Sequence, residues 1–319
     1  MDAAKKTRLR LPENTKTNMI SLLFESMMHG FRLHPHTWKW WKEVTIHKNI
    51  SYGQSPEHKL DVYQPQNPKS HSPICLYIHG GAFTLLSKDT HWMAALQLAL
   101  QGYTVFNINY RLSRTAPFPA AVQDTFEAAK WIYHNASRYG ADQKQMVIGG
   151  ESAGANLTLA VAVASCFALE DSWAQSLYKT NLPIKAVFPI CGFLQASHPE
   201  RYFDKPKLPQ FFKDRIAATS QRYLQGREHL LADPLVLLES NKQPKRKLPA
   251  IYSFVGTRDP ILDDTRRLEK ALQKRKTDYE VRYYPDEVHG FHLAVWRKTS
   301  QKAWQGQQRF LEKYVHFTG

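Results

Sequence analysis

The sequence has few of the features that mark secreted or membrane proteins. Only three of its 319 residues are cysteines, and Cys75, Cys166 and Cys191 stand far apart inside apolar runs. An odd number at this spacing does not indicate a disulfide framework or a zinc site, so we expect three buried thiols and no metal. No run approaches the roughly 18 apolar residues of a membrane span, and the first apolar cluster is too short for a signal peptide. We therefore expect a cytoplasmic protein.

Acidic residues are scarce relative to basic ones. The chain carries 43 Lys and Arg against 28 Asp and Glu, a net charge of +15. Such an excess can accompany binding to nucleic acid or to anionic membranes. Here the charge is spread along the chain, without an RNP signature, zinc-finger spacing or Walker loop. We predict no nucleic-acid partner and keep weak peripheral contact with anionic membrane as a hypothesis.

Short apolar runs alternate with helical patterns from residue 42 onward. Runs that are apolar throughout are typical of strands buried on both faces, and their alternation with helices predicts a mostly parallel central sheet with helices on both faces. Two alternating runs at 43–46 and 59–63 come first. The other expected strands are 74–78, 104–108, 146–148, 186–190, 250–255 and 279–284, and the expected helices include 120–137 and 294–314.

Two segments interrupt this alternation of predicted strands and helices. Residues 1–42 lack strand alternation, and residues 192–241 are too long for a structureless connection. We predict a single domain over residues 1–319, with a small helical cap formed by these two segments. The tryptophans Trp38, Trp40 and Trp41 suit either a pocket wall or packing on the sheet.

The most informative stretch is Gly150 to Gly154, which reads G-x-S-x-G between an apolar strand and an apolar helix. A strand that turns sharply into a helix would expose the hydroxyl of Ser152 at the bend. Glycines flank the serine because a Cβ there would collide with the neighbouring elements. We therefore predict Ser152 as a nucleophile.

A base and an acid follow in the chain order of an α/β-hydrolase. Asp259 and His289 each come soon after an expected strand, where the functional groups of an open α/β sheet gather. A histidine must deprotonate the serine, and a buried carboxylate must orient the histidine. Asp263, Asp264 and His292 are competitors; we expect the two aspartates to cap a helix.

Oxyanion donors are expected at a glycine-rich turn. His79-Gly80-Gly81 directly follows a buried strand, and bare backbone N–H groups can approach a substrate oxygen closely. We predict that Gly80, Gly81 and the N–H of Ala153 form an oxyanion hole. His79 is expected to shape this loop, and Glu151 to have a structural role.

Six motifs in order resemble the hormone-sensitive-lipase-like branch of the α/β-hydrolase esterases. This resemblance implies an α/β-hydrolase fold and hydrolysis of small to medium carboxylic esters through an acyl-serine intermediate, without a cofactor. Three positions depart from the family pattern, namely Ala82 for a third glycine, Glu151 for aspartate and Asn109 for an acidic residue. The motifs are His79 to Phe83, Tyr110 to Leu112, Phe118 to Ala121, Gly150 to Gly154, Asp259-Pro260 and His289 to Phe291.

Two other functions use the same features. An amide-type hydrolase such as an arylformamidase has the same triad and a similar His-Gly-Gly loop, and Tyr52-Gly53 with Leu60 to Tyr63 also suits that group. A non-catalytic ligand receptor or scaffold on this fold would lack a triad member, and here all three are present. The partner expected is a small-molecule ester, and the sequence predicts no oligomeric state.

Overall fold

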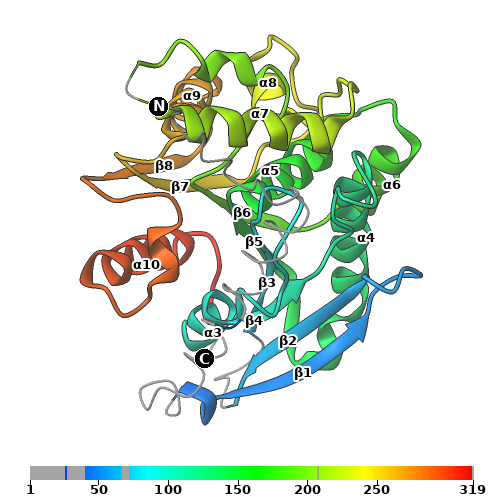
Figure 1. The fold of residues 1–319 in the computed structure, drawn as a ribbon. Coiled ribbons are helices and arrows are strands. Elements are labelled where there is room, and N and C mark those ends of the chain that lie inside the picture. Colours follow the sequence, from blue (N-terminus) through cyan, green and yellow to red (C-terminus); the bar gives the residue numbers. More distant parts are fainter. Residues whose placement is uncertain (1–25, 27–39, 67–71, 207, 318–319) are drawn as a thin grey trace, which may run out of the picture.

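The computed structural model describes residues 26, 40–66, 72–206 and 208–317. Its centre is an eight-stranded sheet in the order β1-β2-β4-β3-β5-β6-β7-β8 (Figure 1). The pairs β1–β2 and β2–β4 are antiparallel, and every other pair is parallel. The strands are β1 (Val44–Ser51), β2 (Lys59–Pro65), β3 (Ser72–Ile78), β4 (Thr104–Ile108), β5 (Ala141–Glu151), β6 (Ile184–Ile190), β7 (Ala250–Gly256) and β8 (Tyr279–Tyr284).

Helices cover both faces of the sheet, as the alternating pattern predicted. One face carries α3 (Trp92–Leu100) and α10 (Lys298–Leu311), and the other carries α4 (Ala120–Asn135), α5 (Ala153–Cys166) and α9 (Leu262–Arg275), with α6 (Ser172–Thr180) outside α4 and α5 (Figure 1). The described residues also form the short 3-10 helices η1 (Ala136–Tyr139), η2 (Pro199–Tyr202) and η3 (Phe291–Leu293).

Two apolar cores lie on opposite faces of the sheet because successive strand side chains point in opposite directions. In β3, Leu76 and Ile78 join the core beneath α4 and α5, whereas Cys75 and Tyr77 join the core beneath α3 and α10. All of β3, β4 and β7 is buried. Burial on both faces explains why these strands are apolar throughout.

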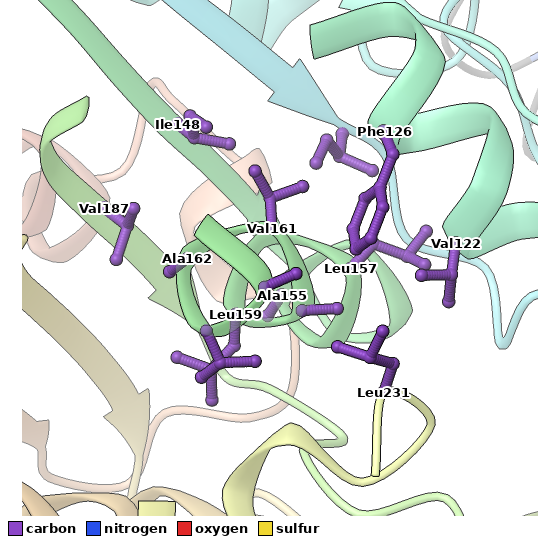
Figure 2. Close-up of a cluster of buried hydrophobic side chains, with 14 of the residues drawn as sticks. Val122, Phe126, Ile148, Ala155, Leu157, Leu159, Val161, Ala162, Val187 and Leu231 are labelled. Atoms are coloured by element: carbon purple, nitrogen blue, oxygen red, sulfur yellow. The ribbon is translucent and has the colours of Figure 1, made fainter. Parts of the chain in front are cut away.

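Helix α5 is as fully enclosed as the central strands. All 14 of its residues are buried, so it is apolar on every side instead of amphipathic. Figure 2 shows Leu157, Leu159 and Val161 projecting from it toward neighbouring side chains, including Phe126 of α4 and Leu231. This packing fixes the helix that begins directly after Ser152.

The connection between β6 and β7 contains η2, α7 (Gln210–Leu224) and α8 (Pro234–Glu239). We call residues 192–241 the β6–β7 insertion. Asp264 in the first turn of α9 holds this insertion, since its Oδ2 accepts hydrogen bonds from the N–H groups of Leu194 (2.9 Å) and Gln195 (3.3 Å). The insertion is therefore tied to the hydrolase core by buried polar contacts.

Most expected strands occur near their predicted bounds, and β4 and β8 match them fully. The strand expected at 146–148 runs from Ala141 to Glu151, and the closing helix is shorter than expected, at Lys298–Leu311. Helices α3 and α6 were not predicted. All three cysteines are buried and free, as expected.

The predicted N-terminal cap segment, residues 1–42, lies almost entirely outside the described residues. At its described end, Trp41 stacks on Trp92 of α3 at a ring distance of 5.1 Å. Trp41 therefore packs against helix α3. No helix in the described ranges has the length and apolar character needed to cross a membrane.

Candidate active site

Ser152 sits where β5 turns into α5. Its backbone has φ 57° and ψ −115°, a strained conformation for a residue with a side chain. A Cβ on Gly150 or on Gly154 would collide with the carbonyl oxygen of Ile78 at the end of β3. The two glycines therefore allow the tight turn that presents Ser152 above the sheet, as the G-x-S-x-G pattern predicted.

Asp259 and His289 meet at the end of the sheet where the parallel strands β7 and β8 finish. His289 Nδ1 lies 2.8 Å from Asp259 Oδ2, and Asp259 Oδ1 accepts the Ile261 N–H at 2.9 Å. The Asp259 side chain is fully buried, whereas the His289 side chain is 34% exposed. A buried carboxylate thus fixes one ring nitrogen of His289 while the ring stays accessible.

The environment of His289 shifts its pKa in opposing directions. Burial favours the neutral ring, but the Asp259 carboxylate and the Cys191 thiol outweigh it and hold the pKa of His289 well above its usual range. Cys191 follows β6 and was not predicted as a site residue.

Ser152 and His289 are not hydrogen bonded to each other here, although they line the same two cavities.

The competing residues have other positions. His292 is completely buried, its ring contacts Phe254 and Trp304, and burial lowers its pKa to about 4. The expectation that Asp263 and Asp264 cap a helix is wrong, because α9 has no side-chain cap. Asp264 instead accepts hydrogen bonds from the β6–β7 insertion and pairs with Arg201 at 3.0 Å.

Two cavities open beside Ser152 and His289. The smaller has a volume of about 170 Å³, and α7 forms one wall of it through Phe212 and Ile216. The larger has a volume of about 600 Å³ and includes Leu85, Phe291 and Trp296. Ser152, His289, Ala82 and Arg215 line both cavities.

The glycine loop after β3 faces the larger cavity, but one of its predicted donors is already engaged. The Gly80 N–H donates to Glu151 Oε1, so it is not available to a substrate oxygen. The N–H groups of Gly81 and Ala82 donate no hydrogen bond to another described residue. The prediction of Gly80 as an oxyanion donor is therefore wrong for this structure.

Glu151 is the centre of a buried polar network behind this loop. Besides the Gly80 N–H, its carboxylate accepts the Tyr77 hydroxyl and lies 2.8 Å from His91 Nε2. Burial alone raises the pKa of Glu151, but His91 and the hydrogen bonds lower it to about 2. Burial opposes protonation of His91, yet Glu151 raises the pKa of His91 above its usual value. A buried ion pair thus anchors the loop.

His79 shapes the same loop. Its ring is buried, stacks on Tyr110 at 4.4 Å and hydrogen bonds the Gly80 carbonyl oxygen at 2.6 Å. The Tyr110 hydroxyl donates to the His79 carbonyl oxygen at 3.0 Å. Burial lowers the pKa of His79 to about 3, so the ring is neutral. These contacts agree with a loop-shaping role.

One group of metal-ligating side chains occurs among the described residues, formed by Cys191, Asp259 and His289 with ligand atoms within 4.8 Å of one another. Tetrahedral zinc with bonds of about 2.0–2.3 Å would separate its ligand atoms by about 3.3 Å or more. The 2.8 Å contact between Asp259 and His289 would have to open to admit an ion to both. The observed geometry is that of a hydrogen-bonded pair beside a thiol.

The chain belongs to the α/β-hydrolase fold family, which matches residues 75–293. This confirms the fold and the family predicted from the sequence motifs. Among curated relatives, it is 26% identical over 250 residues to carboxylesterase NlhH of Mycobacterium tuberculosis, covering 76% of this chain and 74% of that protein. It is 28% identical over 253 residues to an acetyl esterase of Salmonella typhi, covering 78% and 74%.

Solved structures show the same architecture. Esterase B of Lactobacillus rhamnosis superposes with a TM-score of 0.78 at 19% identity, over 94% of this chain and 96% of that one. Esterase LipW of Mycobacterium marinum superposes with a TM-score of 0.77 at 20% identity, over 96% and 92%. At these identities the likeness concerns the fold.

Proposed function

We propose that the protein is a serine carboxylesterase with Ser152 as nucleophile, His289 as base and Asp259 as the residue that orients the base. The observation that carries this proposal is the 2.8 Å contact between His289 and Asp259 beside the strained turn of Ser152. All three residues follow strands of the same sheet. The esterase names of the relatives support the same reaction class.

The reaction starts when Ser152 Oγ attacks the ester carbonyl carbon. His289 Nε2 takes the hydroxyl proton, while Asp259 holds Nδ1 and stabilises the imidazolium. Collapse of the tetrahedral intermediate expels the alcohol, which receives that proton from His289. A water molecule, deprotonated in turn by His289, then attacks the acyl-serine. Collapse of this second intermediate expels the Ser152 oxygen, which takes the proton back from His289, and the acid is released. The Ser152–His289 hydrogen bond, absent here, forms as the substrate binds.

The negative oxygen of the intermediate needs N–H donors that are otherwise unused. We assign Gly81, Ala82 and Ala153 to this role, since Gly80 is held by Glu151. Ala153 begins α5, so its N–H lies at the positive end of a helix. Each donor is expected to contribute about 3 kcal/mol to the reduction of the barrier.

We also propose that the β6–β7 insertion acts as the cap of this site. Its helix α7 forms one wall of the smaller cavity, whose volume of about 170 Å³ suits a short chain. Esters with small to medium acyl groups are therefore the expected substrates. The net charge of +15, together with the exposed phenylalanines Phe211 (66%) and Phe212 (40%) of α7, supports weak contact with an anionic membrane. Sedimentation unaffected by anionic liposomes would contradict that contact.

The experiment that tests the esterase proposal compares 4-nitrophenyl butyrate with N-formylkynurenine, the substrate of the arylformamidase alternative. We expect the butyrate ester to be the better substrate by kcat/KM, and Ser152→Ala to lower kcat by about 10⁶-fold without unfolding the protein. Ser176→Ala, an exposed serine on α6, is the matched control. Preferred cleavage of N-formylkynurenine would select the alternative, and unchanged turnover in Ser152→Ala would reject both.

A further inference from the structure

Arg215 of α7 occupies a position that the proposed chemistry does not explain. It lines the smaller cavity and the larger cavity, together with Ser152 and His289. Arg215 is half-buried. The positive charge of Arg215 therefore belongs to a residue shared by the two cavities, which we expect to receive the acyl and alcohol portions of an ester.

The other charged groups that line the cavities are neutralised. Arg297 of the larger cavity forms two hydrogen bonds to Glu287, at 2.7 and 2.8 Å. Glu151 is paired with His91 behind the glycine loop. The guanidinium of Arg215, by contrast, makes no hydrogen bond or ion pair with any residue in the described ranges. The uncompensated charge of the site is thus positive.

Two other arginines of the β6–β7 insertion have clear structural roles. Arg201 donates to the Ser197 and Gln195 carbonyl oxygens, both at 2.7 Å, and pairs with Asp264. Arg227 donates to the Phe118 carbonyl oxygen. Apart from the backbone hydrogen bonds within α7, the one hydrogen bond of Arg215 in the described ranges is donated by the Thr219 hydroxyl to its backbone carbonyl, at 2.8 Å. Arg215 therefore does not hold the insertion in place.

We propose that Arg215 binds a carboxylate carried by the substrate, so that the preferred esters are short esters with a second, anionic acid group. This inference rests on the proposed esterase function and adds the substrate class. A guanidinium suits this task because it stays charged and offers two parallel N–H donors to a carboxylate. The net charge of +15 would also draw anionic esters toward the protein.

Two matched substrate pairs test the proposal. Monoethyl succinate and ethyl succinamate differ by a carboxylate against an amide on the acyl portion. Acetoxyacetate and acetoxyacetamide differ in the same way on the alcohol portion. We expect the wild-type protein to prefer the anion in at least one pair by kcat/KM. Arg215→Gln should lower that anion-to-neutral ratio by about ten- to a hundredfold, as expected for loss of a charge-assisted hydrogen bond.

Two further variants separate a local contact from the overall charge. Arg215→Lys should retain part of the preference. Lys213→Gln removes a positive charge from the same helix at a residue that lines neither cavity, and it should leave the ratio within about twofold. Thermal melts of each variant verify folding.

The outcomes distinguish this inference from the proposed function. If the wild type hydrolyses the neutral esters but Arg215→Gln leaves both ratios unchanged, the proposal for Arg215 is wrong and the esterase stands. An equal loss in Lys213→Gln would also overturn it, since diffuse charge would then be the cause. If no ester is cleaved and a fluorophosphonate does not label Ser152, the esterase proposal fails, and the inference fails with it.

Discussion

The floor and one wall of the candidate site are built in different ways. The floor is the glycine loop with the polar network behind it, in which the Glu151 carboxylate accepts the Gly80 N–H and the Tyr77 hydroxyl and pairs with His91. These groups are buried. On the wall formed by α7, Arg215 has no partner among the described residues and Phe211 is 66% exposed. A fully bonded floor holds one geometry, as stabilisation of an oxyanion requires. The wall presents a cation without a described partner, and we infer that it selects the substrate.

Among the tests of this comparison, the largest loss of kcat is expected for a substitution of Asp259. Asp259→Asn should lower kcat by about 10⁴-fold, because the asparagine favours the wrong tautomer of His289. His289 is inactive as a base when it is protonated. In the wild type its pKa is raised above the ordinary histidine value of about 6.5. The acidic limb of kcat/KM should therefore lie above that value and move to lower pH in Asp259→Asn. A limb that stays in place would contradict the role of Asp259.

A smaller effect is expected from the network under the floor. Glu151→Gln leaves His91 without its buried partner, which should cost about 3 kcal/mol of folding stability. It should also lower kcat by about a hundredfold, because the glycine loop loses its anchor. Glu151→Asp keeps the charge and should restore part of both. Stability and kcat are read from denaturant unfolding and from 4-nitrophenyl butyrate hydrolysis.

The control for this variant is Glu239→Gln, which removes a half-exposed pair with Arg267 at 2.6 Å in the β6–β7 insertion. It should cost about 1 kcal/mol or less and leave kcat within about twofold. Equal effects of the two variants would mean that the buried Glu151 network contributes no more than a half-exposed ion pair.

The stability contribution of Glu151 should also depend on pH. Because the folded-state pKa of Glu151 is about 2, its contribution to stability is present above pH of about 4.3 and is lost as the pH falls toward 2.

The smallest effect is expected on the wall. Phe212→Ala widens the smaller cavity, so the optimum in a series of 4-nitrophenyl esters should move to longer acyl chains by a few-fold in kcat/KM. The matched variant is Phe203→Ala, since Phe203 is also exposed (45%) but lines neither cavity. A shift of the same size in Phe203→Ala would mean that α7 does not set chain length.

The sequence predicted the parts that depend on local pattern. Strands β4 and β8 were predicted with their full bounds, because buried runs and alternating runs carry a clear periodicity. The order of Ser152, Asp259 and His289 followed from their positions after strands, and Asp259 and His289 are indeed in contact. The spacing of Gly150 and Gly154 predicted the turn because glycine is required where backbones approach closely.

What the sequence did not predict depends on contacts between distant segments. Gly80 looked like an oxyanion donor, but its N–H direction is set by Glu151, 71 residues away in the chain. Asp264 looked like a helix cap, but the insertion folds back and uses its carboxylate. His91 and Arg215 are single polar residues outside any motif. No local pattern distinguishes them from surface residues.

The central claim is that Ser152 forms an acyl-enzyme, and the most direct measurement is the intact mass after treatment with a fluorophosphonate. The account predicts one adduct per chain, located by peptide mapping at Ser152 and absent from Ser152→Ala. Labelling should slow at acid pH as His289 becomes protonated. An unlabelled wild-type protein, or an adduct at another residue, would contradict the account.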